Sequence, residues 1–112
     1  MKKLSDCRVL IVDDVRSNVQ LLTEALKGDY RLSAALDGET ALKAVRSNPP
    51  DLVLLDIVMP GMDGFGVLER LRSDPSTHEV PVMILSSRED VDGKARGFEL
   101  GANDYLTKPF EI

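Results

Sequence analysis

Short apolar runs alternate along this chain with longer segments in which apolar residues recur every three or four positions. The runs occupy residues 8–13, 30–36, 52–55, 82–85 and 105–106. A short, nearly continuous apolar run is typical of a strand buried on both faces, whereas spacing of three and four is typical of a helix with one buried side. Strands that alternate with helices in this way predict a parallel sheet with helices on both faces.

Four segments carry the helical spacing. They begin near Val15, Asp37, Phe65 and Val91. Asp37 is a residue type that favours the N-cap position of a helix. In the first segment one side of the helix is apolar, formed by Val15, Val19, Leu22 and Leu26. In the fourth, the residues that share the apolar side are Val91, Ala95 and Phe98.

A chain of 112 residues suits a single domain with one hydrophobic core. Five strands in this length favour a doubly wound α/β fold with the parallel strand order 2-1-3-4-5. The alternation breaks off after the fifth strand, so we expect one domain over residues 1–112 that stops before a fifth helix. Such a stop would leave apolar surface on the sheet face that the first helix covers.

Charge and composition exclude several classes of protein. The net charge of −5 disfavours direct binding to nucleic acid, because phosphate contacts need a surplus of Lys and Arg. The single cysteine, Cys7, can form no internal disulfide. Asp13 and Asp14 interrupt the first apolar run, which is too short for a secretory signal or a membrane span. We therefore expect a cytoplasmic protein with no membrane contact.

Polar side chains follow four of the five predicted strands. Asp13 and Asp14 follow the first, Asp56 the third, Ser86 the fourth, and Lys108 comes after the fifth. In the order 2-1-3-4-5 these four strands are neighbours. Because the carboxyl ends of parallel strands meet at one edge of the sheet, we expect the polar side chains to converge on a crevice there.

Three carboxylates and a lysine in one crevice indicate phosphoryl chemistry. Clustered carboxylates raise each other's pKa unless a cation neutralises them, and Mg²⁺ or Mn²⁺ would do so with oxygen ligands. Lys108 supplies a positive charge suited to a phosphate, and Ser86 supplies a hydroxyl donor. Positioning and charge neutralisation are the main contributions that a protein makes to phosphoryl transfer.

These residues carry a family resemblance. The chain is similar to the receiver domain of response regulators in two-component systems, a family with a flavodoxin-like fold. The motifs that carry the resemblance are VDD at residues 12–14, LLD at 54–56, MPGMDG at 59–64, Ser86 and KPF at 108–110. Together they cover almost the whole chain in order.

The resemblance implies a role for each acidic residue. Asp56 would be the nucleophile that accepts a phosphoryl group from a phosphohistidine on a sensor histidine kinase or phosphotransfer protein. Asp14, Asp56 and the backbone carbonyl of Val58 would bind the Mg²⁺ ion, with Asp13 holding it through water.

The resemblance also implies roles for three further residues. Lys108 would pair with Asp56 before transfer and with a phosphoryl oxygen after it. Ser86 would hydrogen-bond another phosphoryl oxygen and draw the following loop inward, and the ring of Tyr105 would turn inward as that loop moves. Phosphorylation would then switch an output surface, for which residues 89–105 are the candidate.

Several alternatives remain open. The chain could be the input domain of a larger enzyme, such as a nucleotide cyclase or hybrid kinase, or it could form a homodimer; it is not expected to be an enzyme itself. An aspartyl-phosphate phosphatase would need a second Asp two residues beyond the nucleophile, where this chain has Val58. A flavin or nucleotide binder is disfavoured by the acidic crevice. Asp13 and Asp14 could instead favour the start of a helix, with Asp14 as its cap, and Tyr105 could be a packing residue.

Overall fold

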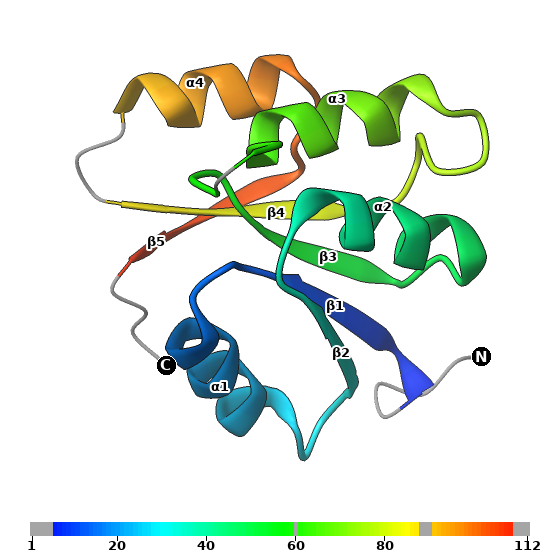
Figure 1. Ribbon diagram of the computed structural model, residues 1–112, viewed down its shortest axis with the longest axis vertical. Helices are drawn as coiled ribbons and strands as arrows, with labels where there is room; N and C mark the ends of the chain where they lie inside the picture. The colour runs from blue at the N-terminus through cyan, green and yellow to red at the C-terminus, as the bar shows by residue number, and fades with distance from the viewer. Residues whose placement is uncertain (1–5, 60, 88–90, 109–112) are drawn as a thin grey trace.

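A five-stranded parallel sheet with the order β2-β1-β3-β4-β5 forms the centre of the molecule, as the sequence predicts (Figure 1). The computed structural model describes residues 6–59, 61–87 and 91–108. The strands are β1 (Arg8–Val12), β2 (Arg31–Ala35), β3 (Leu52–Asp56), β4 (Val82–Ser87) and β5 (Asp104–Lys108). The helices are α1 (Arg16–Leu26), α2 (Gly38–Ser47), α3 (Gly64–Ser73) and α4 (Val91–Glu99).

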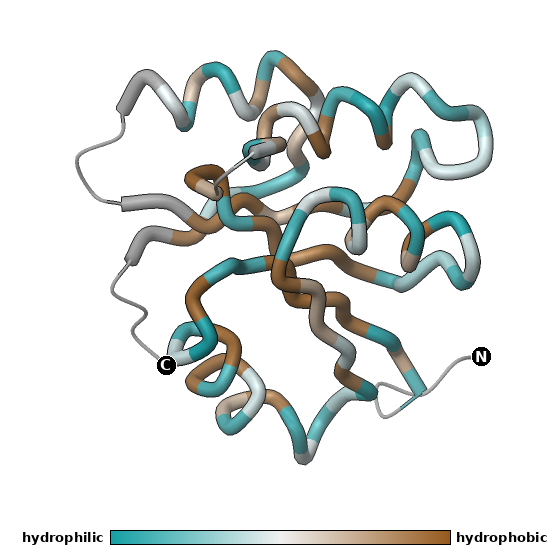
Figure 2. Tube along the Cα trace, viewed as in Figure 1, coloured by the Kyte–Doolittle hydropathy of each residue, from teal (hydrophilic) through white to brown (hydrophobic). Residues whose placement is uncertain are grey.

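The helices are divided unequally between the two faces of the sheet. Helices α2, α3 and α4 lie on one face and α1 lies alone on the other (Figure 1). Hydrophobic residues follow the central strands, as Figure 2 shows, because each strand turns alternate side chains toward a helix layer on either side. One hydrophobic cluster joins Leu10 and Leu55 to α2 and α3, and the other joins Ile11 and Leu54 to Leu22 of α1.

The face that carries α1 has an apolar groove of about 430 Å³. The side chains that line it come from α1 and from four neighbouring strands, and include Leu22, Leu26, Leu54, Met83 and Leu106. The sequence predicts apolar surface on this face for a domain that stops before a fifth helix. The predicted stop itself falls at residues 109–112, outside the described residues, and stays a prediction.

The helix starts agree with the sequence for α2 but not for α1. Asp37 caps α2, and its Oδ1 accepts a hydrogen bond from Thr40 N at 2.8 Å. The possibility that Asp14 caps α1 was wrong, because Val15 is the N-cap and forms no side-chain bond. Val15 is 43% exposed, whereas Val19, Leu22 and Leu26 pack in the second hydrophobic cluster as predicted. Asp14 does not cap this helix; instead Asp13 Oδ1 accepts from Val15 N at 2.9 Å.

The buried side of α4 also differs from the prediction. Ala95 and Phe98 are exposed, whereas Gly93 and Gly97 are buried. A Cβ at Gly97 would clash with the side chain of Ile84, so the helix approaches the sheet closely here and a larger residue would require Ile84 to shift. Glycine is not counted as apolar in a periodicity pattern, and the pattern therefore identified the wrong side.

Candidate functional site

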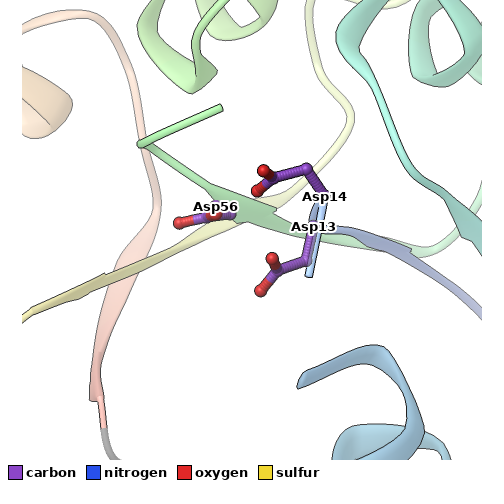
Figure 3. Close-up of side chains that lie close together, drawn as sticks. All are labelled: Asp13, Asp14 and Asp56. Atoms are coloured by element: carbon purple, nitrogen blue, oxygen red, sulfur yellow. The ribbon is translucent and has the colours of Figure 1, made fainter. Parts of the chain in front are cut away.

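The three aspartates predicted to meet do so at the carboxyl ends of β1 and β3. Asp13 and Asp14 follow β1, and Asp56 is the last residue of β3. The register pairs Val12 with Leu55, which brings the next residues of both strands side by side. One carboxylate oxygen from each aspartate lies within 4.8 Å of the others. Figure 3 shows the three carboxylates pointing into the same space.

Two of the three aspartates are buried and the third is half-buried. Asp13 is 0% exposed and Asp56 is 3% exposed, while Asp14 is half-buried. Asp14 Oδ1 is a buried atom with no hydrogen-bond partner in the described part of the chain. A buried carboxylate oxygen that accepts no hydrogen bond is costly unless a cation or a donor reaches it. The donor set consists of hard oxygen ligands, which fits Mg²⁺ or Mn²⁺.

The loop between β3 and α3 lies beside Asp56. Val58 N is 3.4 Å from Asp56 Oδ1, and Gly64 N donates to Ile57 O at 2.8 Å. Gly61 has a φ of +76°, so the turn at this position favours glycine. The side chain of Val58 is 75% exposed, while its backbone N–H lies close to the Asp56 carboxylate.

Ser86 and Lys108 belong to the same edge of the sheet through their backbones. Ser86 pairs with Thr107, and Ser87 pairs with Lys108, in the parallel ladder of β4 and β5. On the other side of β4, Leu85 pairs with Asp56. The predicted adjacency of the strand ends is therefore observed. The side chains of Ser86 and Lys108, and residues Pro109 and Phe110, lie outside the described part of the structure, so their roles stay predictions.

Tyr105 is half-buried and packs against the hydrophobic cluster that includes α2 and α3. The Nζ atom of Lys94, on α4, lies 5.1 Å from the centre of the Tyr105 ring. This distance allows a cation–π interaction between the fourth helix and the fifth strand. The packing alternative is therefore observed, and a switching motion of the ring stays a prediction.

Gly64 belongs to the MPGMDG motif, but no role was predicted for it individually. In the structure Gly64 is the first residue of α3, and a Cβ there would clash with the carbonyl oxygen of Asp56. The sequence does contain an indication of this close approach. A glycine is not needed at the position directly after a helix-capping aspartate, so its presence there points to a steric requirement. Hydropathy periodicity does not detect such a close approach.

Known proteins of one family share the sequence of this chain over nearly its whole length. The profile of the family described as "Response regulator receiver domain" matches residues 9–112. The chain is 44% identical over 105 residues to "Response regulator PleD" of Caulobacter vibrioides, covering 93% of this chain and 23% of the relative. It is 43% identical over 112 residues to "Probable cyclic di-GMP phosphodiesterase" of Vibrio cholerae, covering 100% of this chain and 25% of the relative.

Two further comparisons extend this result. The chain is 44% identical over 105 residues to "DNA-binding response regulator MtrA" of Mycobacterium tuberculosis, covering 93% of this chain and 45% of the relative. The crystal structure of chemotaxis protein CheY4 of Vibrio cholerae matches with a TM-score of 0.88 and 30% identity, over 95% of this chain and 89% of that one. The chain thus spans a quarter or less of the length of PleD and the phosphodiesterase. Across the described ranges, the structure contains no helix long and apolar enough to cross a lipid bilayer.

Proposed function

The chain belongs to the response regulator receiver domain family of two-component signalling, and on this premise we propose that it is a phosphorylation switch whose acceptor is Asp56. The observation that carries the proposal is the approach of three carboxylates to within 4.8 Å at the ends of β1 and β3. Carboxylates this close together form an oxygen donor set that suits a bound cation. A nucleophilic carboxylate must stay ionised, so a divalent cation is the arrangement that keeps Asp56 reactive.

Mg²⁺ or Mn²⁺ fits this donor set. Asp13, Asp14 and Asp56 would hold it together with the backbone carbonyl of Val58, and the bound ion would neutralise charge on the transferring phosphoryl group. The buried Oδ1 of Asp14, which accepts no hydrogen bond from the described residues, supports a ligand at this position.

The reaction is a group transfer from a phosphohistidine to Asp56. A carboxylate oxygen of Asp56 attacks the phosphorus, an O–P bond forms, and the P–N bond to the histidine breaks. The phosphoryl group thus leaves a sensor histidine kinase or phosphotransfer protein and becomes an acyl phosphate. Lys108 and Ser86, whose backbones lie at the same edge of the sheet, would contact phosphoryl oxygens with their ammonium and hydroxyl groups.

The signal would leave the domain through the fourth and fifth strands. Contact of Ser86 with the phosphoryl group would move the loop after β4, and Tyr105 would respond because it lies on the neighbouring strand. The cation–π contact between Lys94 and Tyr105 connects this change to α4. Phosphorylation would then shift the population between two forms of the output surface at residues 89–105 and change its affinity for an output domain or a second copy.

We further propose that the domain regulates a larger protein. PleD and the phosphodiesterase match this chain over only 23% and 25% of their lengths, so a receiver is a minor part of each. The part of the chain that matches is the receiver alone, which is not itself a catalytic enzyme. MtrA is named a DNA-binding response regulator, and this chain matches 45% of its length. The expectation of no direct contact with nucleic acid therefore applies to residues 1–112 and not to a larger protein that contains them.

An aspartyl-phosphate phosphatase is the less suitable function. Such an enzyme needs an acid or base two residues beyond its nucleophile, and this position holds Val58, whose side chain is 75% exposed. An apolar side chain can neither donate nor accept a proton there.

Intact mass spectrometry tests the proposed function. The chain is incubated with acetyl phosphate in the presence and absence of Mg²⁺, as wild type and as Asp56→Asn. We expect the wild type to gain one phosphoryl group only with Mg²⁺, and the variant to gain none. A folded wild-type chain that gains no mass under any condition, or a variant that gains as much as the wild type, would contradict the proposal.

A further inference from the structure

The loop between β3 and α3 closes on itself at Gly64. Gly64 is buried, and its N–H donates to the carbonyl oxygen of Ile57 at 2.8 Å. A Cβ at this position would clash with Asp56 O and would lie 2.7 Å from Ile57 Cα and 2.9 Å from Asp56 C. All three atoms belong to the backbone, so no rotation of a side chain could relieve the contact.

Two other glycines near this loop differ in what surrounds them. A Cβ at Gly66 would lie 3.1 Å from Cγ of Met62, and a Cβ at Gly38 would lie 2.8 Å from Cγ2 of Val67. The Cβ at Gly38 would also lie 3.2 Å from Cβ and from Sδ of Met62. All of these neighbours are side-chain atoms, which move by a rotamer change or a small displacement more easily than backbone atoms do. Of the three, Gly64 is the position where a methyl group would displace the backbone of Asp56.

The contact at Gly64 determines where the loop residues lie relative to the acceptor. The chain leaves the sheet after Ile57 and returns at Gly64, where the backbone hydrogen bond joins the two ends of the loop. Asp63 Oδ1 accepts from Gly66 N at 2.9 Å and fixes the start of α3 on the return side. Val58, on the outgoing side, has its N–H 3.4 Å from Asp56 Oδ1. Widening the contact therefore moves Asp56 and Val58 relative to each other.

We propose that Gly64 is a positioning residue for the phosphoryl acceptor. Because Gly64 has no side chain, α3 begins against the backbone of Asp56. This contact holds Asp56 and Val58 in the geometry that binds the cation and receives the phosphoryl group. This inference rests on the proposed function. It assigns the effect to the backbone and requires no contact between Gly64 and the substrate.

Substitution Gly64→Ala should weaken the site more than the fold. Displacement of reacting groups by about 1 Å can lower a rate by about 100-fold. We expect the rate of phosphorylation by acetyl phosphate to fall by about 10- to 100-fold and the affinity for Mg²⁺ to fall by about 10-fold, since ligand positions from Asp56 and Val58 shift together.

The experiment compares the wild-type chain with Gly64→Ala, Gly66→Ala and Gly38→Ala. Mg²⁺ affinity is measured by titration calorimetry, the phosphorylation rate by intact mass, and stability by urea unfolding without Mg²⁺. Gly66→Ala and Gly38→Ala are the matched controls, because a Cβ at either position would contact side chains, chiefly those of Met62 and Val67, and not the backbone of Asp56. We expect only Gly64→Ala to lose Mg²⁺ affinity while still folded.

Each outcome decides the inference. Wild-type affinity and rate in folded Gly64→Ala would overturn it, as would a loss of Mg²⁺ affinity in Gly38→Ala equal to that in Gly64→Ala. If Gly64→Ala does not fold, the substitution is made in the Gly66→Ala background, since alanine favours the helix; failure to fold there too would overturn the inference, because the glycine would then be required by the fold. A wild-type chain that takes up no phosphoryl group would remove the proposed function, and the Mg²⁺ affinities would still decide the role of Gly64.

Discussion

The two edges of the sheet, where the strands begin and where they end, differ in how their charged side chains are arranged. At the edge where strands begin, Arg72 donates four hydrogen bonds that bring distant segments together. Its partners are the carbonyl oxygens of His78 at 3.1 Å, Val80 at 2.7 Å and Gly101 at 3.0 Å, and Oδ1 of Asn103 at 3.0 Å. Burial lowers the pKa of this guanidinium, which still stays charged at neutral pH.

Other polar groups at this edge are satisfied in the same way. Asn103 Oδ1 also accepts from Val82 N at 2.9 Å, and Asn103 N donates to Val82 O at 2.8 Å. Asp51 Oδ2 accepts from Arg8 N at 2.8 Å at the start of β1 and β3. Charged side chains that hydrogen-bond the backbone stabilise the ends of the strands.

The edge where strands end gathers three carboxylates within 4.8 Å instead. Charges of one sign held this close destabilise a fold unless something neutralises them. The difference teaches that hydrogen bonds from side chains stabilise the sheet at the edge away from the site, whereas the site itself gathers oxygen ligands of the kind that a divalent cation prefers.

The largest effect should follow from removing Arg72. Arg72→Ala leaves carbonyl groups at the α3–β4 and α4–β5 connections without a donor, so we expect the free energy of unfolding to fall by about 2–4 kcal/mol. Mg²⁺ affinity should be unchanged in the folded variant, because the edge with the carboxylates is not altered. Urea unfolding at neutral pH, with calorimetric titration of Mg²⁺, measures both.

Arg70→Ala is the matched control on the same helix. Arg70 is 55% exposed at its side chain and makes one long ion pair with Glu39 at 3.7 Å, so its loss should change stability by no more than about 0.5 kcal/mol. Equal losses in the two variants, or a weakened Mg²⁺ site in Arg72→Ala, would break the distinction between the two edges.

The sequence predicts the edge with the carboxylates much better than the opposite edge. Strands buried on both faces are visible as apolar runs, and the strand order then places Asp13, Asp14 and Asp56 together without any side-chain detail. The role of Arg72 has no such signal. Three of its partners are backbone carbonyls, and Gly101 lies 29 residues further along the chain, so no residue type marks the contact.

The errors in the prediction have a related cause. Periodicity identified the wrong side of α4 because close approach to Ile84 selects Gly97, which has no apolar side chain to count. The fifth strand was predicted too short, since Asp104 and Lys108 join the ladder through their backbones. Backbone contacts of this kind depend on tertiary geometry and not on hydropathy.

An effect of opposite sign is expected at the acidic edge. Asp14→Asn removes one of three like charges and keeps the shape of the side chain, so the free energy of unfolding without divalent cations should rise by about 1 kcal/mol. Mg²⁺ at ten times its dissociation constant should stabilise the wild type by about 1.4 kcal/mol and the variant by much less. Thermal unfolding with and without Mg²⁺, with Ca²⁺-free buffers and EDTA for the metal-free arm, tests this. A variant less stable than the wild type in EDTA would show that the carboxylates do not repel one another appreciably.

The smallest effect concerns Asp74, which follows α3 on the side where the strands begin. Hydrogen bonds from the backbone N–H and hydroxyl of Ser76, with a contribution from Arg46, lower the pKa of this carboxyl from its ordinary value of 3.8. A carboxyl whose pKa is lower in the folded state stabilises the fold above the unfolded pKa, and this contribution is lost as the pH falls through the folded pKa. The wild type should therefore be slightly more stable than Asp74→Asn at pH 7, and the difference should shrink as the pH is lowered below 3.8. Urea unfolding from pH 7 to pH 3 follows it, and because Asp74 is exposed to solvent and salt, the difference should stay well below that for Arg72→Ala. A difference that grows toward acid would contradict the prediction, because these hydrogen bonds would then not stabilise the ionised carboxyl of Asp74.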